Sequence, residues 1–405
     1  MASTTKGATI FFKSLPKIPI IGKMGWQKVH ALLQKEPLEP TVVSSSVTGA
    51  ASREGVNIPA HINFGDAIVV DQKKSVGSYV ADLKGNKFLD LYSNDNSLPL
   101  GYNHSGLKTG LSNENIALHL LQGTNTALTP SQAVLDVVDE TFTSVAPHGL
   151  TEVNLTAQSE NEANELALRA ALSKYSQQNG SNGPLSVISF KGNSHGDTLA
   201  TLSASSDRVS SKIDVPAFQW SNLDFPALKY PLIENEKVNR AEEERCLENV
   251  ENTIKSLRGR APVGAIIVEP IQSNGDAYAT PFFFRGLRHL SRQYGVNVVA
   301  DETQTNLSTG NNWAHQHWGE DVVPDFVTFG RRMQASGYYT SPEFRDYATD
   351  ELAIGSNNIA RAFVFQEINK ILNKQNLISF SNDAGAFVRV HLIQLAAHFP
   401  DLVQN

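Results

Sequence analysis

The sequence predicts an α/β fold in which a mostly parallel central sheet is flanked by helices. From about residue 77 onward, short apolar β-type runs alternate with stretches of helical periodicity. The apolar runs do not alternate with polar residues, which is typical of strands that are covered on both faces. The chain has 405 residues, of which 40% are hydrophobic and 19% charged, so it is long enough to bury a sizeable core.

The individual elements follow from these patterns. The segment 77–92 alternates around a Gly-Asn pair and predicts a β-hairpin. Strands are expected over 151–156, 185–190, 263–270, 296–301 and 325–330. Helices are expected around 134–138 and 163–170, over 237–258 and 281–294, and over one long stretch from about 356 to 398.

The chain divides into four parts by composition and pattern. We expect a basic N-terminal arm (1–60), a small lead-in with the hairpin (61–95), a large α/β domain (96–345) and a helical C-terminal tail (346–405). The first 35 residues hold six lysines and no acidic residue. This composition indicates either an organelle-targeting segment or an arm that binds an acidic partner surface, and the sequence leaves both open.

Charge and cysteine content exclude several classes of function. The net charge of −7 is mild and evenly mixed, so nucleic acid is not an expected partner. The single cysteine, Cys246, excludes an internal disulfide framework and a cysteine-rich metal site within one chain. His315 and His317 lie between two tryptophans and indicate packing, so no metal site is expected. No apolar run approaches the roughly 20 residues of a membrane span.

Seven segments in order resemble one family, the class III pyridoxal-phosphate-dependent aminotransferases, and within it the 4-aminobutyrate (GABA) transaminases. They are "LDLYSNDNSLPLGYNH", "SENEANELALRAA", "SFKGNSHGDTLA", "GAIIVEPIQSNGD", "RGLRHLSRQYGVNVVADETQT", "WAHQHWGEDVVPDFVTFGRRM" and "PEFR". The resemblance runs from about residue 60 to the end. It implies the large domain of a PLP-transferase fold (aspartate aminotransferase fold type I). Because family members continue past the last residue of this sequence, it also implies that the C-terminal small domain is largely missing.

The sequence departs from this family where the cofactor is held. The family's cofactor lysine matches the seventh residue of "DFVTFGR", which is Arg331. A guanidinium stays protonated, with a pKa above ~12, and has no free amine lone pair to form an imine. The phosphate cradle of the family matches Ser159, Glu160 and Asn161, where a glycine and a small hydroxyl residue would normally follow the serine. A carboxylate there should repel a phosphate.

The residues that match the family's substrate-binding and cofactor-stacking positions also differ from the family pattern. The arginine that grips the substrate carboxylate in the resembling transaminases matches Asp197, and the aromatic residue that stacks on the pyridine ring matches Ser194. The threonine that a partner subunit contributes to the cradle falls near Leu352. By resemblance, the substrate site is therefore degenerate.

Four positions keep the family's residue types. Asp301 matches the residue that holds the pyridine nitrogen, and His195, Glu269 and Gln304 are also retained. They are either remnants of a working site or strand-end residues that hydrogen-bond the scaffold, and the sequence favours the second interpretation. We expect the Arg331 guanidinium to occupy cofactor space and to pair with Asp301 or Glu269.

Taken together, these departures favour a protein that is not an enzyme and binds no cofactor. This catalytically inactive relative of GABA transaminase would be a structural or assembly subunit of a larger protein complex. Its partners would bind the N-terminal arm and the face left by the missing domain, and a homo- or heterodimer is compatible with this. The location would be the mitochondrial matrix side, or else the cytoplasm. Two alternatives stay open, an active pyridoxal-phosphate-dependent 4-aminobutyrate-type aminotransferase and a ligand sensor that uses the remodelled pocket.

Overall fold

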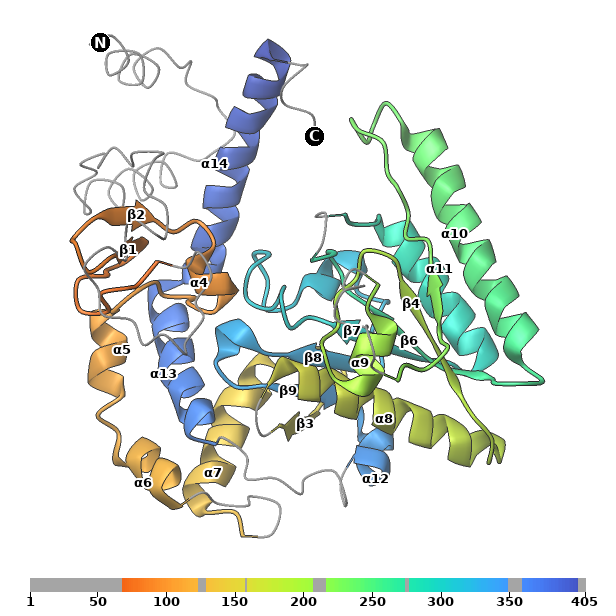
Figure 1. The fold of residues 1–405 in the computed structure, drawn as a ribbon, viewed down its shortest axis with the longest axis horizontal. Helices are drawn as coiled ribbons and strands as arrows, with labels where there is room; N and C mark the ends of the chain where they lie inside the picture. Colours follow the sequence, from red (N-terminus) through yellow and green to blue (C-terminus); the bar gives the residue numbers. More distant parts are fainter. Residues whose placement is uncertain are drawn as a thin grey trace.

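The computed structural model describes residues 68–122, 129–156, 159–206, 216–273, 277–348 and 359–399. The expected basic arm (1–60) and Leu352 lie outside the described residues. Within them, the architecture is a seven-stranded sheet with helices on both faces, shown in Figure 1.

The sheet has the strand order β3-β9-β8-β7-β6-β4-β5. The strands β8, β7, β6, β4 and β5 pair in parallel, while β9 pairs antiparallel with both β8 and β3. Their bounds are β3 Glu152–Leu155, β4 Ser186–Phe190, β5 Ser221–Leu223, β6 Val263–Val268, β7 Asn297–Asp301, β8 Phe326–Phe329 and β9 Gly337–Thr340. The expected mostly parallel α/β fold and its five strands are confirmed, and the sequence missed β5 and β9.

Successive residues of the central strands feed two separate hydrophobic cores. In β6, Ile266 and Val268 belong to one core, and Ala265 and Ile267 belong to the other. Side chains alternate across a strand, so each core lies on one face of the sheet. This explains the unbroken apolar runs in the sequence, since both faces of these strands are buried.

Helices cover the two faces. Along the second core lies α8 (Glu160–Asn179), whose alanines Ala167, Ala170 and Ala171 are fully buried. The first core is closed by α10 (Glu236–Leu257) and α11 (Pro281–Tyr294), which run side by side at one end of the molecule (Figure 1). The remaining short helices are α5 Ser105–Gly110, α6 Glu114–Gln122, α7 Gln132–Val137, α9 Leu199–Ala204 and α12 Arg345–Ala348.

The segments at the two ends of the described chain lie next to each other in Figure 1. The hairpin expected over 77–92 is confirmed as β1 (Tyr79–Ala81) and β2 (Lys87–Leu89), which pair antiparallel. The helical stretch expected over about 356–398 is confirmed for the described residues 359–398. It is two helices, α13 (Ala360–Gln375) and α14 (Leu377–His398), because Asn376 between them adopts a left-handed conformation with φ of 52°.

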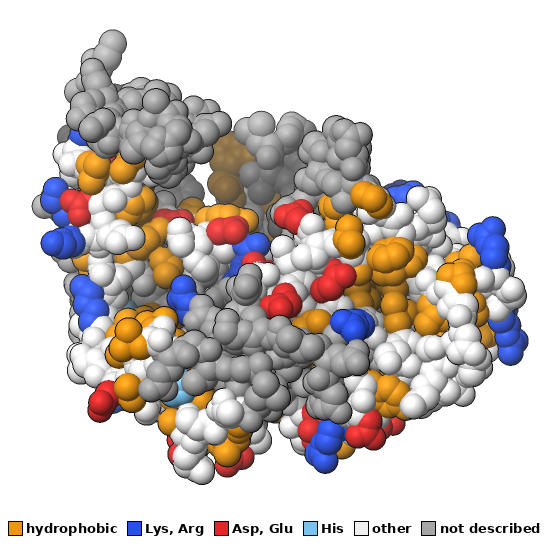
Figure 2. Space-filling view, turned by 60° about the horizontal axis from the view of Figure 1, so that its bottom comes forward, with side chains coloured by type: hydrophobic (Ala, Val, Ile, Leu, Met, Phe, Trp, Pro, Cys, Tyr) orange, Lys and Arg blue, Asp and Glu red, His pale blue; other side chains and the backbone are white. Residues whose placement is uncertain are grey.

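The described surface is mixed in charge. On the face drawn in Figure 2, acidic and basic side chains are interspersed among hydrophobic and uncharged ones. Of the helices in the part that the structure describes, none is both long and apolar enough to cross a membrane. Among the same residues, no group of three or more histidine, cysteine, aspartate or glutamate side chains is placed to hold a metal ion.

Candidate active site

Asp301 is the centre of a buried polar cluster at the carboxyl end of β7. Its Oδ2 accepts from His195 Nδ1 and from Asn164 Nδ2, each at 2.8 Å. Its Oδ1 accepts from the Thr303 hydroxyl at 2.7 Å and backbone N–H at 3.1 Å, and more weakly from Thr328 Oγ1 at 3.4 Å. Residues from β7, β8, α8 and the loop after β4 thus hold one carboxylate, because the carboxyl ends of parallel strands meet at one edge of a sheet.

Neighbouring amides fix the His195 ring. Its Nε2 lies 3.2 Å from Asn193 Nδ2, whose amide is in turn oriented by Gln272 Nε2 donating to Asn193 Oδ1 at 2.8 Å. Since Nε2 therefore accepts, Nδ1 carries the proton that His195 donates to Asp301. Both interpretations of Asp301 and His195, as remnants of a working site and as scaffold residues, are compatible with these contacts.

Glu269 follows β6 and is 1% exposed. Its Oε2 accepts from the Ser194 N–H at 3.1 Å and from the Ser273 N–H and hydroxyl, each at 3.3 Å. Its Oε1 is buried without a partner among the described residues. Burial raises the pKa of Glu269 to about 7, while His195 lowers it and the nearby Asp301 carboxylate raises it further. Glu269 can therefore hold or release a proton near neutral pH.

Arg331 does not reach either of these carboxylates, so the expected pairing with Asp301 or Glu269 is wrong. Its guanidinium forms ion pairs with Asp95 and with Glu160, the second through Nε at 3.1 Å. Nη1 also donates to the Asp95 carbonyl at 3.0 Å. With its amide oxygen turned toward Arg331, Gln304 accepts from Nε and Nη2 at 2.9 and 2.7 Å. The partners of the Arg331 guanidinium among the described residues are thus Asp95, Glu160 and Gln304, and neither Asp301 nor Glu269 is among them.

The residues that match the phosphate cradle lie at the start of α8. Ser159 is the N-cap residue, but its side chain accepts no capping hydrogen bond, and Glu160 is the first helical residue. A carboxylate in the first turn is favourable for the helix itself. The Asn161 side chain lies against Gly196, where its Oδ1 would be 2.7 Å from an added Cβ. The structure thus brings Glu160 and Arg331 into contact and leaves Asp301 in a separate cluster.

The two other positions that differ from the family pattern, Asp197 and Ser194, lie on the loop between β4 and α9. Asp197 is exposed, and Ser194 is half-buried with its backbone N–H on Glu269. Asp197 is therefore placed at the surface of this loop rather than inside the Asp301 cluster.

Sequence reasoning missed a segment that faces Arg331. Residues Ser93–Asn96 (α4) all have positive φ, between 50° and 60°, which costs on the order of 1 kcal/mol per non-glycine residue. Three side chains after β8 hold this turn. Arg331 binds Asp95, Arg332 Nη2 donates to Asn96 Oδ1 at 2.7 Å, and Gln334 Nε2 donates to the Ser97 carbonyl at 2.6 Å. The available signal was the run "SNDN", since Asn and Asp tolerate this conformation best.

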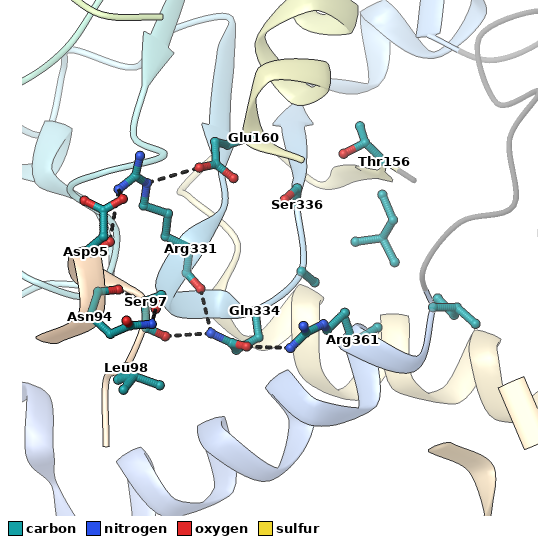
Figure 3. A pocket seen from close by; sticks show the side chains of 14 residues that line it. Asn94, Asp95, Ser97, Leu98, Thr156, Glu160, Arg331, Gln334, Ser336 and Arg361 are labelled. Carbon is teal, nitrogen blue, oxygen red and sulfur yellow. Dashed lines mark hydrogen bonds and ion pairs between the residues drawn. The ribbon is translucent and has the colours of Figure 1, made fainter. Parts of the chain in front are cut away.

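A cavity of about 550 Å³ opens between this turn, the start of α8 and the start of α13. Figure 3 shows its lining, with Arg331, Glu160 and Asp95 on one side and Gln334 and Arg361 on another. Neither Asp301 nor Glu269 lines it. A ligand sensor, one of the alternatives left open by the sequence, was expected to use a pocket near Asp301 and Glu269. This cavity is a different one.

Residues 63–405 match the family model described as aminotransferase class III. A 4-aminobutyrate aminotransferase of Dictyostelium discoideum is 36% identical over 360 residues, which are 83% of this chain and 72% of that protein. The mitochondrial 4-aminobutyrate aminotransferase of Sus scrofa is 32% identical over 410 residues, 94% of this chain and 82% of that protein. The chain therefore belongs to the class III aminotransferase family.

Solved structures agree with this assignment. A lysine aminotransferase of M. tuberculosis in its internal aldimine form has a TM-score of 0.73 to this chain, with 26% sequence identity. The match covers 87% of this chain and 83% of that structure. The PLP-transferase fold is therefore confirmed. The expected loss of a C-terminal domain is not tested by these matches and stays a prediction.

Two expectations from the sequence are contradicted. The chain was expected not to be an enzyme, but its family and its relatives are named as aminotransferases, and nothing in the comparisons is a sign of inactivity. It was also expected to bind no cofactor, but the family and the solved neighbours point to pyridoxal phosphate. The substitutions at Arg331, Glu160 and Asp197 each change one contact, while the family model matches residues 63–405 and the fold of an aminotransferase is kept.

The residues fit pyridoxal phosphate only in part. Asp301, the residue that would hold a pyridine nitrogen, is present, but both of its oxygens already accept hydrogen bonds. Arg331 offers no amine for an imine, and Glu160 carries negative charge at the cradle. The residues of this chain therefore do not fit a covalently attached cofactor at position 331.

Proposed function

We propose that this chain is a pyridoxal-phosphate-dependent aminotransferase of the 4-aminobutyrate type that holds its cofactor by contacts alone. The observation that carries the proposal is the buried Asp301 carboxylate with its His195 partner at 2.8 Å, in a chain 36% identical to a 4-aminobutyrate aminotransferase. When bound, the cofactor supplies an electron sink for the carbon that bears the amino group.

Three residues of this chain have defined tasks in this proposal. Asp301 would accept a hydrogen bond from the protonated pyridine nitrogen and stabilise its charge, and His195 would keep the carboxylate oriented through Nδ1. Glu269, whose pKa burial raises to about 7, would exchange a proton near neutral pH. Because position 331 lacks an amine, we derive no covalent step at this residue.

The proposal is tested by binding and by activity. The purified chain is titrated with pyridoxal phosphate while absorbance in the near-visible range and melting temperature are followed. We expect saturable binding and a raised melting temperature. Asp301→Asn, which keeps the size of the side chain, should weaken this binding.

Activity is measured as transfer of the amino group from 4-aminobutyrate to a panel of 2-oxo acids, with the cofactor in excess. We expect turnover that depends on added pyridoxal phosphate. Saturating cofactor without transfer to any oxo acid would refute the activity, and the absence of binding would refute the whole proposal.

We also propose a mitochondrial location. The relative from Sus scrofa is named mitochondrial, as are those from Mus musculus and Homo sapiens, while others are not. Six lysines and no acidic residue in the first 35 positions support a targeting role for the arm. Expression of the full chain with a C-terminal fluorescent tag should give mitochondrial fluorescence, and a tag that stays in the cytoplasm would contradict this. The expected assembly role and its protein partners stay predictions.

A further inference from the structure

The Arg361 guanidinium forms no ion pair with a described residue. It lies in the first turn of α13 and lines the 550 Å³ cavity. Its side chain donates one hydrogen bond, from Nη1 to Gln334 Oε1 at 2.7 Å, and among the described residues no carboxylate forms an ion pair with it. A cation in the first turn also opposes the helix dipole, so Arg361 is not placed there to stabilise α13.

Gln334 fixes the position of the Arg361 guanidinium. Its Nε2 donates to the carbonyls of Ser97 at 2.6 Å and Arg331 at 3.2 Å, which forces its Oε1 to face the other way. Arg361 binds that oxygen with one of its five N–H donors, as Figure 3 shows. Arg361 is exposed, so its other donors are open to solvent and can also reach a ligand in the cavity that it lines.

The second arginine of the cavity differs from Arg361 in this respect. Arg331 is held by Asp95 and Glu160, so its charge is already paired. An incoming anion would have to displace one of these carboxylates to reach Arg331. Arg361 can bind an anion without breaking an ion pair, and it is therefore the preferred anion contact.

The rest of the lining indicates the kind of anion. Part of the wall is aliphatic and part carries hydroxyls. The aliphatic residues are Leu98, Leu155, Ala335, Ile359 and Ala362, and the hydroxyls are Ser97, Thr156 and Ser336. A guanidinium pairs with a carboxylate through two parallel hydrogen bonds. The lining thus suits a ligand with a carboxylate at one end and a short aliphatic chain, and the volume is in the range of small-molecule sites.

We propose that this cavity binds a small aliphatic carboxylic acid and that Arg361 binds its carboxylate, with Gln334 as a positioning residue. This deepens the proposed function, on which the choice of 4-aminobutyrate as a probe rests. It also gives the chain a substrate-carboxylate contact, since the position that resembles the transaminase arginine is the exposed Asp197.

The test measures binding by calorimetry, without added cofactor, using butyrate, 4-aminobutyrate and n-butylamine as probes. Butyrate and 4-aminobutyrate should bind, and butylamine, which lacks the carboxylate, should bind at least 10-fold more weakly. Arg361→Gln should weaken binding of both acids by roughly 10-fold or more, the range expected for a lost charged hydrogen-bond pair. Arg361→Lys, which keeps the charge but not the paired geometry, should fall between them.

The matched control is Arg292→Gln, which removes an exposed arginine on α11 away from the cavity and should bind like the unmodified chain. Circular dichroism establishes that each variant is folded, and Arg361→Lys carries the test if Arg361→Gln is not. The proposal is overturned if neither acid binds, if butylamine binds as well as butyrate, or if Arg361→Gln and Arg361→Lys both bind like the control. Acid binding without amino transfer would overturn the proposed function alone, and transfer without an effect at Arg361 would overturn this inference alone.

Discussion

Replacement of Glu269 by glutamine tests whether this buried carboxyl group is protonated in the folded protein. Glutamine keeps the size of the side chain but does not titrate. Its carbonyl oxygen can take the place of Oε2, which accepts from the Ser194 and Ser273 N–H groups. Its NH₂ then takes the place of Oε1, which has no partner to lose. The comparison therefore isolates the charge.

The size of the effect follows from the shift in pKa. The pKa of Glu269 is about 7 in the fold against 4.5 for an ordinary glutamate, and burial is the main cause. Between these values the folded state binds a proton that the unfolded state has lost, so the free energy of unfolding falls as pH rises. About 2.5 pKa units correspond to about 3 kcal/mol. This is a large share of a typical folding free energy of roughly 5–15 kcal/mol.

The assay is urea denaturation of the unmodified chain and Glu269→Gln from pH 4 to pH 8.5. The free energy of unfolding of the unmodified chain, minus that of the variant, should fall by about 3 kcal/mol between pH 4.5 and pH 7 and be flat outside this window. Titration of other groups largely cancels in this difference. A difference that stays constant within about 1 kcal/mol across the window would show that Glu269 is ionised throughout and refute the reasoning.

Three further predictions concern position 331, the core and the sheet. Arg331→Lys should allow pyridoxal phosphate to be fixed at residue 331 by borohydride, seen by peptide mass spectrometry. The unmodified chain treated alike is the control, and labelling at surface lysines alone would contradict the prediction. Phe365→Ala, at a fully buried ring, should lower the free energy of unfolding by about 3–5 kcal/mol in urea, and a loss below about 1 kcal/mol would mean that the ring is not packed in the core. Gly337→Ala would place a Cβ 2.2 Å from the Asn154 carbonyl, so it should separate β9 from β3 and lower the melting temperature by several degrees, whereas an unchanged melting temperature would show that the strands are further apart.

The central strands could be predicted because burial on both faces leaves a plain signal in the sequence. All residues of β6, β7 and β8 are buried, and each strand reads as an apolar run. The same signal fails for β5, which has only three half-buried residues, "SNL". It also fails for β9, "GYYT", whose glycine and polar ends resemble a turn.

The break between α13 and α14 had no sequence signal of the usual kind. The segment around Asn376 holds neither glycine nor proline, and helical periodicity continues across it. Asparagine is among the few residues that adopt the left-handed conformation at low cost, and the packing of α13 against the first core decides that it does so here. Tertiary contacts of this kind are outside what periodicity can report.

The sequence predicts which candidate site residues lie at the carboxyl ends of the parallel strands. It does not predict the direction of a side chain that is set by distant hydrogen-bond and ion-pair partners. Asp301 and Glu269 follow parallel strands, whose carboxyl ends share one edge of the sheet. The direction of Arg331 is set by acceptors 171 and 236 residues away in the chain. No local pattern indicates such partners, so the place of Arg331 after β8 could be predicted and its ion pairs could not.

In the sequence, Glu160 and Arg331 are two separate substitutions at the family's cofactor-binding positions. In the structure, the two side chains form an ion pair. A carboxylate about 4 Å from a phosphate costs roughly 4 kcal/mol per unit charge at an effective dielectric of 20. That figure assumes an unpaired carboxylate, whereas Glu160 lies 3.1 Å from the Arg331 Nε, whose positive charge attracts a phosphate at comparable range. The repulsion is therefore offset only in part, because Asp95 pairs with the same guanidinium and leaves the three side chains with a net charge of −1. The missing amine is different, because no neighbouring charge can replace a lone pair, so Arg331 constrains how the cofactor is held rather than whether it is held.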